Sequence, residues 1–520
     1  MGDYKMKLEM ERSRCFASAH MLLSMLGLLL FADALFTPRA VAAALTSPMA
    51  FIKSTDAPLT GTLVVNTDVP TRVSVSVDDG AETWKRNFYD YSVAHSVPMA
   101  GFRPDRTNEL TVTLWEKSQE FTILTDVVTF VTAPLPASFP KIKVLTAMPA
   151  LMEPGYTLFR CVVNNFNIGY LTIIDHNGEV VWYSTLLSSH DFRQLSDGNL
   201  LMGKTTGFAE VDILGQTLKT YPIVAGFSAD PHENLPTERG TILYFSEKST
   251  NVVDFPSSAT DPTATPKTAA VGYDWVLEVS TNNGATIGRW NLLEMLDRGR
   301  ISYLTFVKDA FGWDNHHGNA IFEDFRDGGI IASLRTQNSI IKFTREGQLK
   351  WILGTHDNWG PDFQQYLLTP VGEPFEWQWG QHGIKVTPQG TLLVYDDGNY
   401  RASPFDSSVP DAQNYSRAVE YEINEDTMEV RQVWEYGKDK ADVFFTSFAG
   451  DVEWLPMTGH VLVNFSAVSY VNGEHPSPGS PKATETRIQE VTHEANPEVV
   501  WDISIFDSTN TSTNYTGFFG

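Results

Sequence analysis

The sequence predicts an all-β protein, a six-bladed β-propeller preceded by a small N-terminal β-sandwich. The main observation is a recurring pair of hairpins, each made of two short apolar strands around a turn glycine. A four-stranded unit that recurs along the chain is typical of propeller blades. No long segment shows the 3.6-residue period of an amphipathic helix, which argues against an α/β sheet.

The first hairpin of each unit opens with a polar residue and reaches its turn glycine at a fixed distance. The spacing is eight residues in four copies, and three of these four begin with histidine. A fifth copy begins at His316-His317 and has a longer strand before Gly328. If the units repeat around one axis, their opening residues converge on it. The four copies with the short spacing are 190–198, 232–240, 382–390 and 451–459.

The second hairpin of each unit alternates apolar and polar residues, turns at a polar segment and usually ends in tryptophan. Period-2 alternation bounded by Gly, Asn and Asp is the signal of a β-hairpin. Six copies occur, which sets the expected number of blades at six. They span residues 173–182, 210–215, 277–290, 341–351, 419–434 and 488–501, and the copy at 210–215 has no tryptophan.

The N-terminal part of the sequence has a different pattern of strands. Residues 45–140 contain alternating runs at 62–65, 71–77, 109–115 and 127–131 without the blade pattern, and they end in a Pro-rich linker. Short strands with frequent turns indicate a small β-sandwich. We therefore predict a sandwich domain with its linker over residues 45–140 and the propeller over residues 141–520.

Residues 1–44 have the pattern of a signal peptide. Basic residues precede an apolar stretch at 21–32, and small residues at 40–44 offer cleavage sites. The apolar stretch is short for a membrane span. We expect a protein exported to the periplasm or the medium, with no membrane association after the signal is removed.

Charge and cysteine content narrow the partners and the chemistry. The formal net charge of −25 disfavours nucleic acid and anionic membranes as partners. It also means that an anionic substrate needs a local cationic pocket. The chain has two cysteines, and Cys15 leaves with the signal, so no intrachain disulfide is expected. Cys161 lies among apolar residues and is expected to be a buried small side chain.

Three histidines are the candidate site residues. Each of His232, His317 and His382 opens an inner hairpin, and three imidazoles directed at one axis are costly as structure alone. His190 and His316 are interpreted as structural. A three-histidine site has two common uses, ligation of a metal or binding and transfer of an anionic group.

Arg335 and Asn319 favour the anion. Arg335 ends a strand that should pair with the strand carrying His317 and Asn319, so its side chain can reach the same pocket. A guanidinium is repelled by a divalent cation but forms a bidentate contact with an oxyanion. The alternative for Arg335 is a salt bridge between blades. We therefore expect no metal at the site.

Aromatic residues precede His382. Trp377 and Trp379 alternate along the segment that leads to it, a pattern that could form a slot for a flat ring. Ordinary packing between blades explains the same residues equally well. Arg417, farther along the chain, is a second candidate for the positive charge that an anion would need.

These segments resemble the bacterial aryl-sulfate sulfotransferases, exported enzymes that move a sulfuryl group between phenols without a nucleotide sulfate donor. The resemblance implies a six-bladed propeller preceded by a small β domain. It also implies that His382 is the histidine that becomes transiently sulfated, and that His232, His317, Asn319 and Arg335 surround the sulfate. The resembling stretches are 317–321, 330–335, 349–353, 381–382, 415–421 and 432–438.

The chain departs from that family in two places. Enteric members carry a cysteine pair in the loop before the nucleophilic histidine, and residues 367–376 contain none. A late threonine of the family pocket matches Thr446, Ser447 or Ala449 ambiguously. The first departure places the order of this loop and the substrate range in question.

The expected activity is ping-pong transfer of a sulfuryl group from a phenolic sulfate ester to a second phenol, through a sulfohistidine and without a cofactor. The partners are therefore small molecules, and the sequence leaves room for a homodimer. Three other functions remain open: a metal-dependent propeller hydrolase or lactonase, an aryl sulfatase of the same fold, and a non-catalytic binding propeller.

Overall fold

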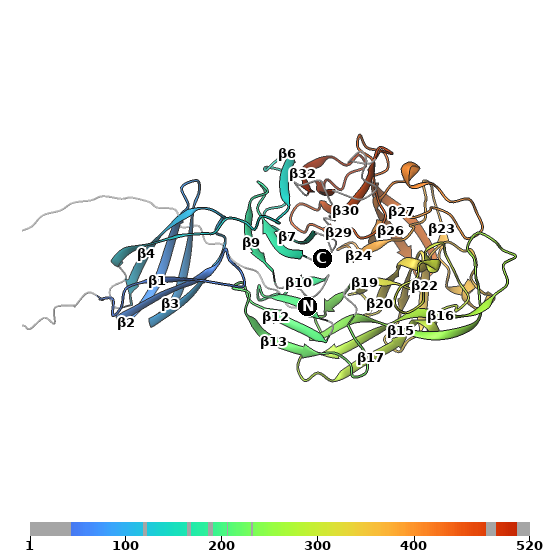
Figure 1. Ribbon diagram of the computed structural model, residues 1–520, viewed down its shortest axis with the longest axis horizontal. Coiled ribbons are helices and arrows are strands. Elements are labelled where there is room, and N and C mark those ends of the chain that lie inside the picture. The colour runs from blue at the N-terminus through green and yellow to red at the C-terminus, as the bar shows by residue number, and fades with distance from the viewer. Residues whose placement is uncertain are drawn as a thin grey trace, which may run out of the picture. The chain divides into compact units, whose positions relative to one another are not determined.

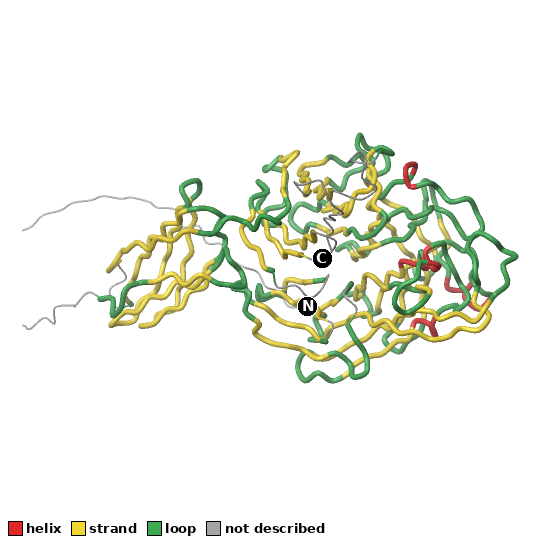
Figure 2. The backbone as a smooth tube through the Cα atoms, viewed as in Figure 1, coloured by secondary structure: helices red, strands yellow, loops and turns green. Residues whose placement is uncertain are grey.

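The computed structural model describes residues 43–117, 122–163, 168–185, 191–204, 206–229, 232–474 and 485–506. Strands dominate these residues (Figure 2), and the one α-helix among them is α1, Leu292–Met295. No helix in these ranges is long and apolar enough to cross a membrane. The expected signal peptide, residues 1–44, lies outside the described residues except for its last two, so export stays a prediction.

The N-terminal strands form one continuous sheet rather than two separate ones. Its order is β1-β2-β4-β5, with β3 paired to β2. The long strand β2 pairs with β1 and β3 through its first half and with β3 and β4 through its second half. The sheet encloses its own core, in which Phe51 of β1 stacks on Phe130 of β5 at 3.9 Å. The strands are β1 Ala50–Lys53, β2 Gly61–Asp78, β3 Thr83–Met99, β4 Thr107–Glu116 and β5 Thr122–Val131.

The described strands after β5 form six further sheets around one axis (Figure 1). Five of the sheets follow chain order. Three short strands pair with longer ones, β18 Trp313–Asp314 with β16, β23 Thr369–Pro370 with β27 and β28 Phe444–Thr446 with β30. The main strands are β7 Thr157–Val163, β8 Ile168–Ile174 and β9 Val180–Ser184; β10 Phe192–Gln194, β11 Leu200–Lys204, β12 Gly207–Val211 and β13 Thr217–Pro222; β14 Asn234–Pro236, β15 Thr241–Phe255, β16 Lys267–Ser280 and β17 Thr286–Asn291; β19 Gly318–Glu323, β20 Ile330–Leu334, β21 Ser339–Phe343 and β22 Leu349–Gly354; β24 His382–Val386, β25 Leu392–Asp396, β26 Arg417–Asn424 and β27 Glu429–Tyr436; and β29 Asp451–Trp454, β30 Val461–Val471, β31 Glu485–Val491 and β32 Val499–Phe506.

Burial of apolar side chains between neighbouring sheets makes the ring a propeller. A separate buried cluster fills each of the six interfaces, including the one between the last sheet and the first. The last sheet also gains a strand from the opposite end of the ring, because β6 (Lys141–Ala147) pairs with β32. Segments about 360 residues apart in the chain thus lie side by side in one sheet.

The recurring tryptophans join each sheet to the next. Five of them donate their indole N–H to a turn of the following sheet, at 2.8–3.1 Å. Trp501 of the last sheet donates to the carbonyl of His176 in the first, which closes the ring. A buried indole needs such an acceptor, so the position of tryptophan at the end of the outer hairpin is fixed by its neighbour.

The six predicted outer hairpins are all found, as β8–β9, β12–β13, β16–β17, β21–β22, β26–β27 and β31–β32. Cys161 is buried and free, as expected. The prediction missed β1 and β3, and it divided β2 into two strands. Pro70 and a register shift lie within β2, and they interrupt the alternation from which a strand is recognised.

Candidate active site

The candidate histidines lie where the innermost strands begin. His382 is the first residue of β24, His317 directly precedes β19, and His232 lies two residues before β14. The first strands of successive sheets contact one another around the axis (Figure 1). Strand starts on neighbouring blades therefore come together, and the rings of His232 and His317 meet edge to face at 4.8 Å. His190 lies outside the described residues.

His382 is held by a carboxylate. Its Nδ1 lies 2.7 Å from Oδ2 of Asp397, and both side chains are buried. The two residues face each other across the hairpin of β24 and β25, in which His382 pairs with Tyr395. A carboxylate on Nδ1 fixes the tautomer with the proton on that nitrogen, so the other nitrogen, Nε2, presents a lone pair.

The surroundings of His382 disfavour protonation of Nε2 in addition to Nδ1. Burial lowers the pKa of His382 well below its ordinary value, and the positive charge of Arg335, His317 and His232 lowers it further. Burial raises the pKa of the Asp397 carboxyl, so the carboxylate attracts the proton on Nδ1 strongly. The imidazole is therefore uncharged at neutral pH.

Nε2 of His382 faces a strained loop. The backbone N–H of Ala449 points at this nitrogen from 3.4 Å. Ala449 has a φ of 61°, a left-handed conformation that is uncommon for a residue with a side chain. Such strain persists where the surrounding structure fixes it, often at functional sites. Of the three residues that matched the family threonine ambiguously, Thr446 is engaged with Tyr395 and Ser416, whereas Ser447 and Ala449 direct backbone groups toward the site.

His317 also has a carboxylate partner. Its Nδ1 lies 2.6 Å from Oδ2 of Asp314, which leaves Nε2 on the opposite side of the ring. The residue has a φ of 49°. The next residue is Gly318, where a Cβ would come within 2.3 Å of the Phe245 ring. Only glycine fits there, and its close approach to the neighbouring sheet sets where His317 leaves the strand.

Arg335 lies directly after β20, where its N–H donates to the carbonyl of His317 at 3.1 Å. Its Nη2 donates to the carbonyl of Ser447 at 3.0 Å. Its Nε lies 3.9 Å from Oδ2 of Asp397 and has no hydrogen-bond partner although it is buried. The guanidinium is thus held at one edge by the protein, and Nε remains a donor for a ligand. The salt bridge between blades that was the alternative is present only as this long contact.

Asn319 connects the site histidines. Its Nδ2 donates to the carbonyl of Gln381 at 2.8 Å, which ties β19 to the residue before His382. Its Oδ1 is buried without a hydrogen-bond partner. His316, interpreted as structural, is buried, and burial lowers its pKa to about 4.

The two tryptophans are placed differently. The Trp377 ring packs in the cluster between the fourth and fifth propeller sheets, against Phe375 at 4.8 Å. Trp379 contributes its backbone: its N–H donates to Asp396, and its carbonyl accepts from Gly398. Arg417, the second candidate for the positive charge, is buried and paired with Asp396 and Glu435, and it also donates to the carbonyls of Glu376 and Trp377. Arg417 therefore fixes the segment that leads to His382.

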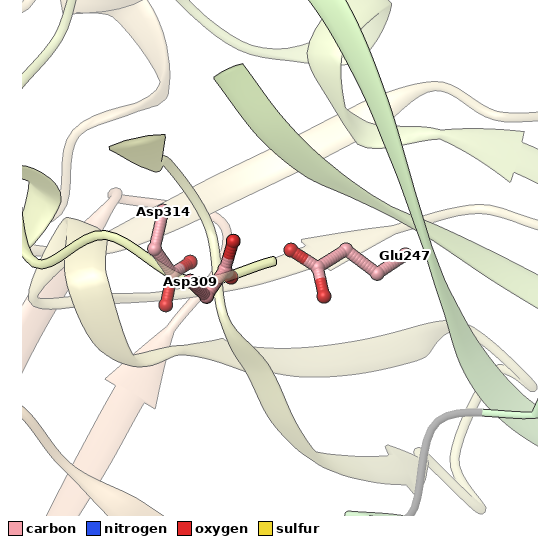
Figure 3. Close-up of side chains that lie close together, drawn as sticks. All are labelled: Glu247, Asp309 and Asp314. Carbon is pink, nitrogen blue, oxygen red and sulfur yellow. The ribbon is translucent and has the colours of Figure 1, made fainter. Parts of the chain in front are cut away.

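Figure 3 shows three neighbouring carboxylates, one of which, Asp314, is the partner of His317. Oxygens of Glu247, Asp309 and Asp314 lie within 4.8 Å of one another, the one such group of three His, Cys, Asp or Glu ligands among the described residues. Burial and the neighbouring acids raise the pKa of Glu247 to about 10. Glu247 is therefore protonated at neutral pH, and the negative charge beside Asp314 is reduced. None of the three candidate histidines belongs to this group.

Sequence reasoning missed three contributors to the site: Asp397, Asp314 and the carbonyl of Ser447. A signal existed for the first, because Asp396-Asp397-Gly398 follows directly on an apolar strand that pairs with the strand of His382. It existed for the second, because Asp314 stands three residues before His317. The contact of the Ser447 carbonyl could not be predicted, because a backbone group leaves no pattern of side chains in the sequence.

Family models match nearly all of the described chain. The model described as arylsulfotransferase (ASST) matches residues 127–516, and the arylsulfotransferase Ig-like domain matches residues 54–133. The chain belongs to the arylsulfotransferase family.

Two curated relatives carry the name arylsulfate sulfotransferase AssT. The one from Escherichia coli O6:H1 (strain CFT073) is 28% identical over 353 residues, and the one from Lelliottia amnigena is 26% identical over 359 residues. Each alignment covers 56% of this chain and 56% of the relative. The chain thus aligns with little more than half the length of each relative.

Similarity to solved structures is more distant. A Synechocystis apocarotenoid oxygenase mutant matches 69% of this chain and 81% of its own, with a TM-score of 0.32 and 10% identity. A streptogramin B lyase matches 62% of this chain and 94% of its own, with a TM-score of 0.29 and 9% identity.

Proposed function

We propose that this arylsulfotransferase moves a sulfuryl group from a phenolic sulfate ester to a second phenol, with His382 as nucleophile. The observation that carries the proposal is the buried pair of His382 and Asp397, beside which lies the Nε of Arg335, a buried donor that makes no hydrogen bond. The pair supplies an uncharged imidazole whose Nε2 carries a lone pair, and the guanidinium supplies a donor for a sulfonate oxygen. No metal or cofactor enters the reaction.

In the first half-reaction, Nε2 of His382 attacks the sulfur of the donor, and the bond between sulfur and the phenolic oxygen breaks. The phenoxide takes a proton from His317 or His232, whose rings are in contact. The sulfated ring gains positive charge, which Asp397 compensates through Nδ1. Transfer of this kind has a loose transition state, so placement and charge stabilisation contribute more than deep activation of the nucleophile.

The second half-reaction is the reverse with another phenol. The same histidine removes the proton of the acceptor hydroxyl, the phenolic oxygen attacks sulfur, and the bond between sulfur and Nε2 breaks. His382 leaves as the uncharged imidazole with which it began. Asp314 holds Nδ1 of His317, so the proton moves through its Nε2.

The alternatives make different use of the same residues. A metal-dependent hydrolase or lactonase needs the histidines as ligands of one ion through Nε2, and the positive charge of Arg335 beside His382 opposes such a cation. A sulfatase replaces the phenol by water. A binding propeller forms no covalent intermediate.

The oligomeric state of the protein is a separate question, and a homodimer stays a prediction.

Dependence on an acceptor is the test of the proposed function. Donor turnover without phenol should be slow after one cycle, because a sulfohistidine in a buried site is shielded from water. Added phenol should raise the steady rate strongly, and varying donor and acceptor together should give parallel double-reciprocal lines. A gain of one sulfuryl group on the intact protein should appear with donor alone. If inorganic sulfate accumulates at the full rate without phenol, the protein is a sulfatase.

Two replacements of Arg335 should distinguish the contribution of its positive charge from that of its planar guanidinium group. We expect Arg335→Ala to lower kcat/KM by about a hundredfold or more, since it removes a donor to the developing charge. Arg335→Lys keeps the charge but loses the planar group that reaches Ser447 and the sulfonate together, so its loss should be intermediate. Steady-state kinetics with one aryl sulfate measures both. Wild-type activity in Arg335→Ala would reduce Arg335 to a contact between blades.

A further inference from the structure

Two tyrosines from distant parts of the chain stack on each other. The ring centroids of Tyr303 and Tyr400 are 5.0 Å apart, and the ring planes differ by 15°. Tyr303 directly precedes the 3-10 turn Leu304–Phe306, and Tyr400 lies in the loop after β25. Both side chains are partly buried, so part of the pair faces solvent.

The neighbours of both tyrosines hold the Arg335 turn. Asn399, next to Tyr400, donates to the carbonyl of Ser447 at 3.0 Å, the same oxygen that accepts from Arg335. Ser302, next to Tyr303, donates through Oγ to the carbonyl of Thr336 at 2.6 Å. The stacked pair is therefore attached on both sides to the segment that carries the guanidinium.

The backbone at Tyr400 is strained. Its φ is 62°, and the N–H of Arg401 donates to the carbonyl of Asn399 at 2.7 Å, which closes a three-residue turn around Tyr400. A γ-turn with positive φ is rare and costly for a residue with a side chain. Here Arg401 clamps the turn, through Asp396 at 3.1 Å and the Tyr415 ring at 3.7 Å. Strain that the surroundings fix in this way is often found at functional sites.

We infer that Tyr303 and Tyr400, the tyrosine pair, form the surface on which the aromatic ring of the substrate stacks while its sulfate lies at Arg335 and His382. This inference rests on the proposed function. The aromatic ring of the substrate would then contact the tyrosine pair and not Trp377, whose side chain packs between blades. In a ping-pong reaction the donor ring and the acceptor ring use the pair in turn.

Stacking defines the substrate class. An aromatic ring prefers an offset or edge contact with a tyrosine, and the attraction grows with ring area. The tyrosine pair should therefore select flat aromatic sulfates over alkyl sulfates, and naphthyl over phenyl compounds. Its contribution should disappear for inorganic sulfate, which binds through Arg335 but has no ring.

The experiment compares rings of different size in Tyr400→Leu and wild type. We expect kcat/KM to fall about three- to tenfold for phenyl sulfate and further for 2-naphthyl sulfate. The inhibition constant of inorganic sulfate should stay as in the wild type. Tyr400→Phe should restore most of the loss, because it keeps the ring. Tyr303→Leu, at a residue with an ordinary φ of −58°, should show the same dependence on ring size even if Tyr400→Leu folds poorly.

A matched control is Tyr89→Leu, at a 68% exposed tyrosine of the N-terminal sheet, which should behave as wild type with every substrate. Losses of equal size for both rings and for inorganic sulfate would mean that the tyrosine pair only supports Arg335, and the inference would be wrong. It would also be wrong if Tyr400→Leu and Tyr303→Leu retained wild-type kinetics. Absence of sulfuryl transfer in the wild type would instead overturn the proposed function.

Discussion

His382→Ala should abolish sulfuryl transfer, with a loss of at least about a thousandfold in kcat. The buried imidazole contacts Asp397 through Nδ1 and presents an unprotonated Nε2 to the site. Steady-state kinetics with an aryl sulfate and a phenol measures the loss. Mass spectrometry of the intact protein with donor alone should show no sulfated species in the variant.

A second histidine provides the matched control. His460 also contacts a carboxylate through Nδ1, Glu490 at 2.7 Å, but it lies in the turn between β29 and β30. His460→Ala should retain wild-type kinetics and sulfation. If His382→Ala kept more than a few per cent of the activity, the nucleophile would lie elsewhere, and His317 would be the next candidate.

Asp397→Asn should lower kcat by about a hundred- to ten-thousandfold, the range expected when a histidine loses the carboxylate that fixes its tautomer. An amide N–H directed at Nδ1 would place the imidazole proton on Nε2 and block the lone pair. The loss should persist at all pH values, since raising the pH does not restore the tautomer. Thermal unfolding measures stability in parallel, because an unpaired polar group would remain in the core.

The pH profile of the wild type follows from the same pair. The uncharged form of His382 is the active one, and its pKa is lowered well below the ordinary 6.5. Activity that depends on this group is therefore present throughout the neutral range and falls only at pH values well below 6.5.

The control for Asp397→Asn is Glu490→Gln, the equivalent change in the pair of His460 and Glu490, which should leave kcat unaffected. A kcat for Asp397→Asn within about threefold of the wild type would show that Asp397 does not set the tautomer.

The stacked tyrosines and the contact between Arg335 and Ser447 could not be predicted from the sequence. Tyr303 and Tyr400 lie 97 residues apart and share no pattern, so nothing in the sequence joins them. Arg335 and Ser447 are 112 residues apart, and the contact uses a backbone carbonyl that no side chain reveals. Trp377 has the spacing of a ligand slot, yet packing between two sheets decides its direction.

The sequence by itself determined the ring of sheets and the place of the histidines. Alternation with a period of two sets which residues face a neighbouring sheet, and the recurring tryptophan sets where one sheet is bonded to the next. His317 and His382 open equivalent strands, so a repeating architecture brings them together. Only the tertiary structure decided their partners, protonation and neighbours. Those depend on loops from different sheets, whose meeting is fixed by burial and by hydrogen bonds between residues far apart in the chain.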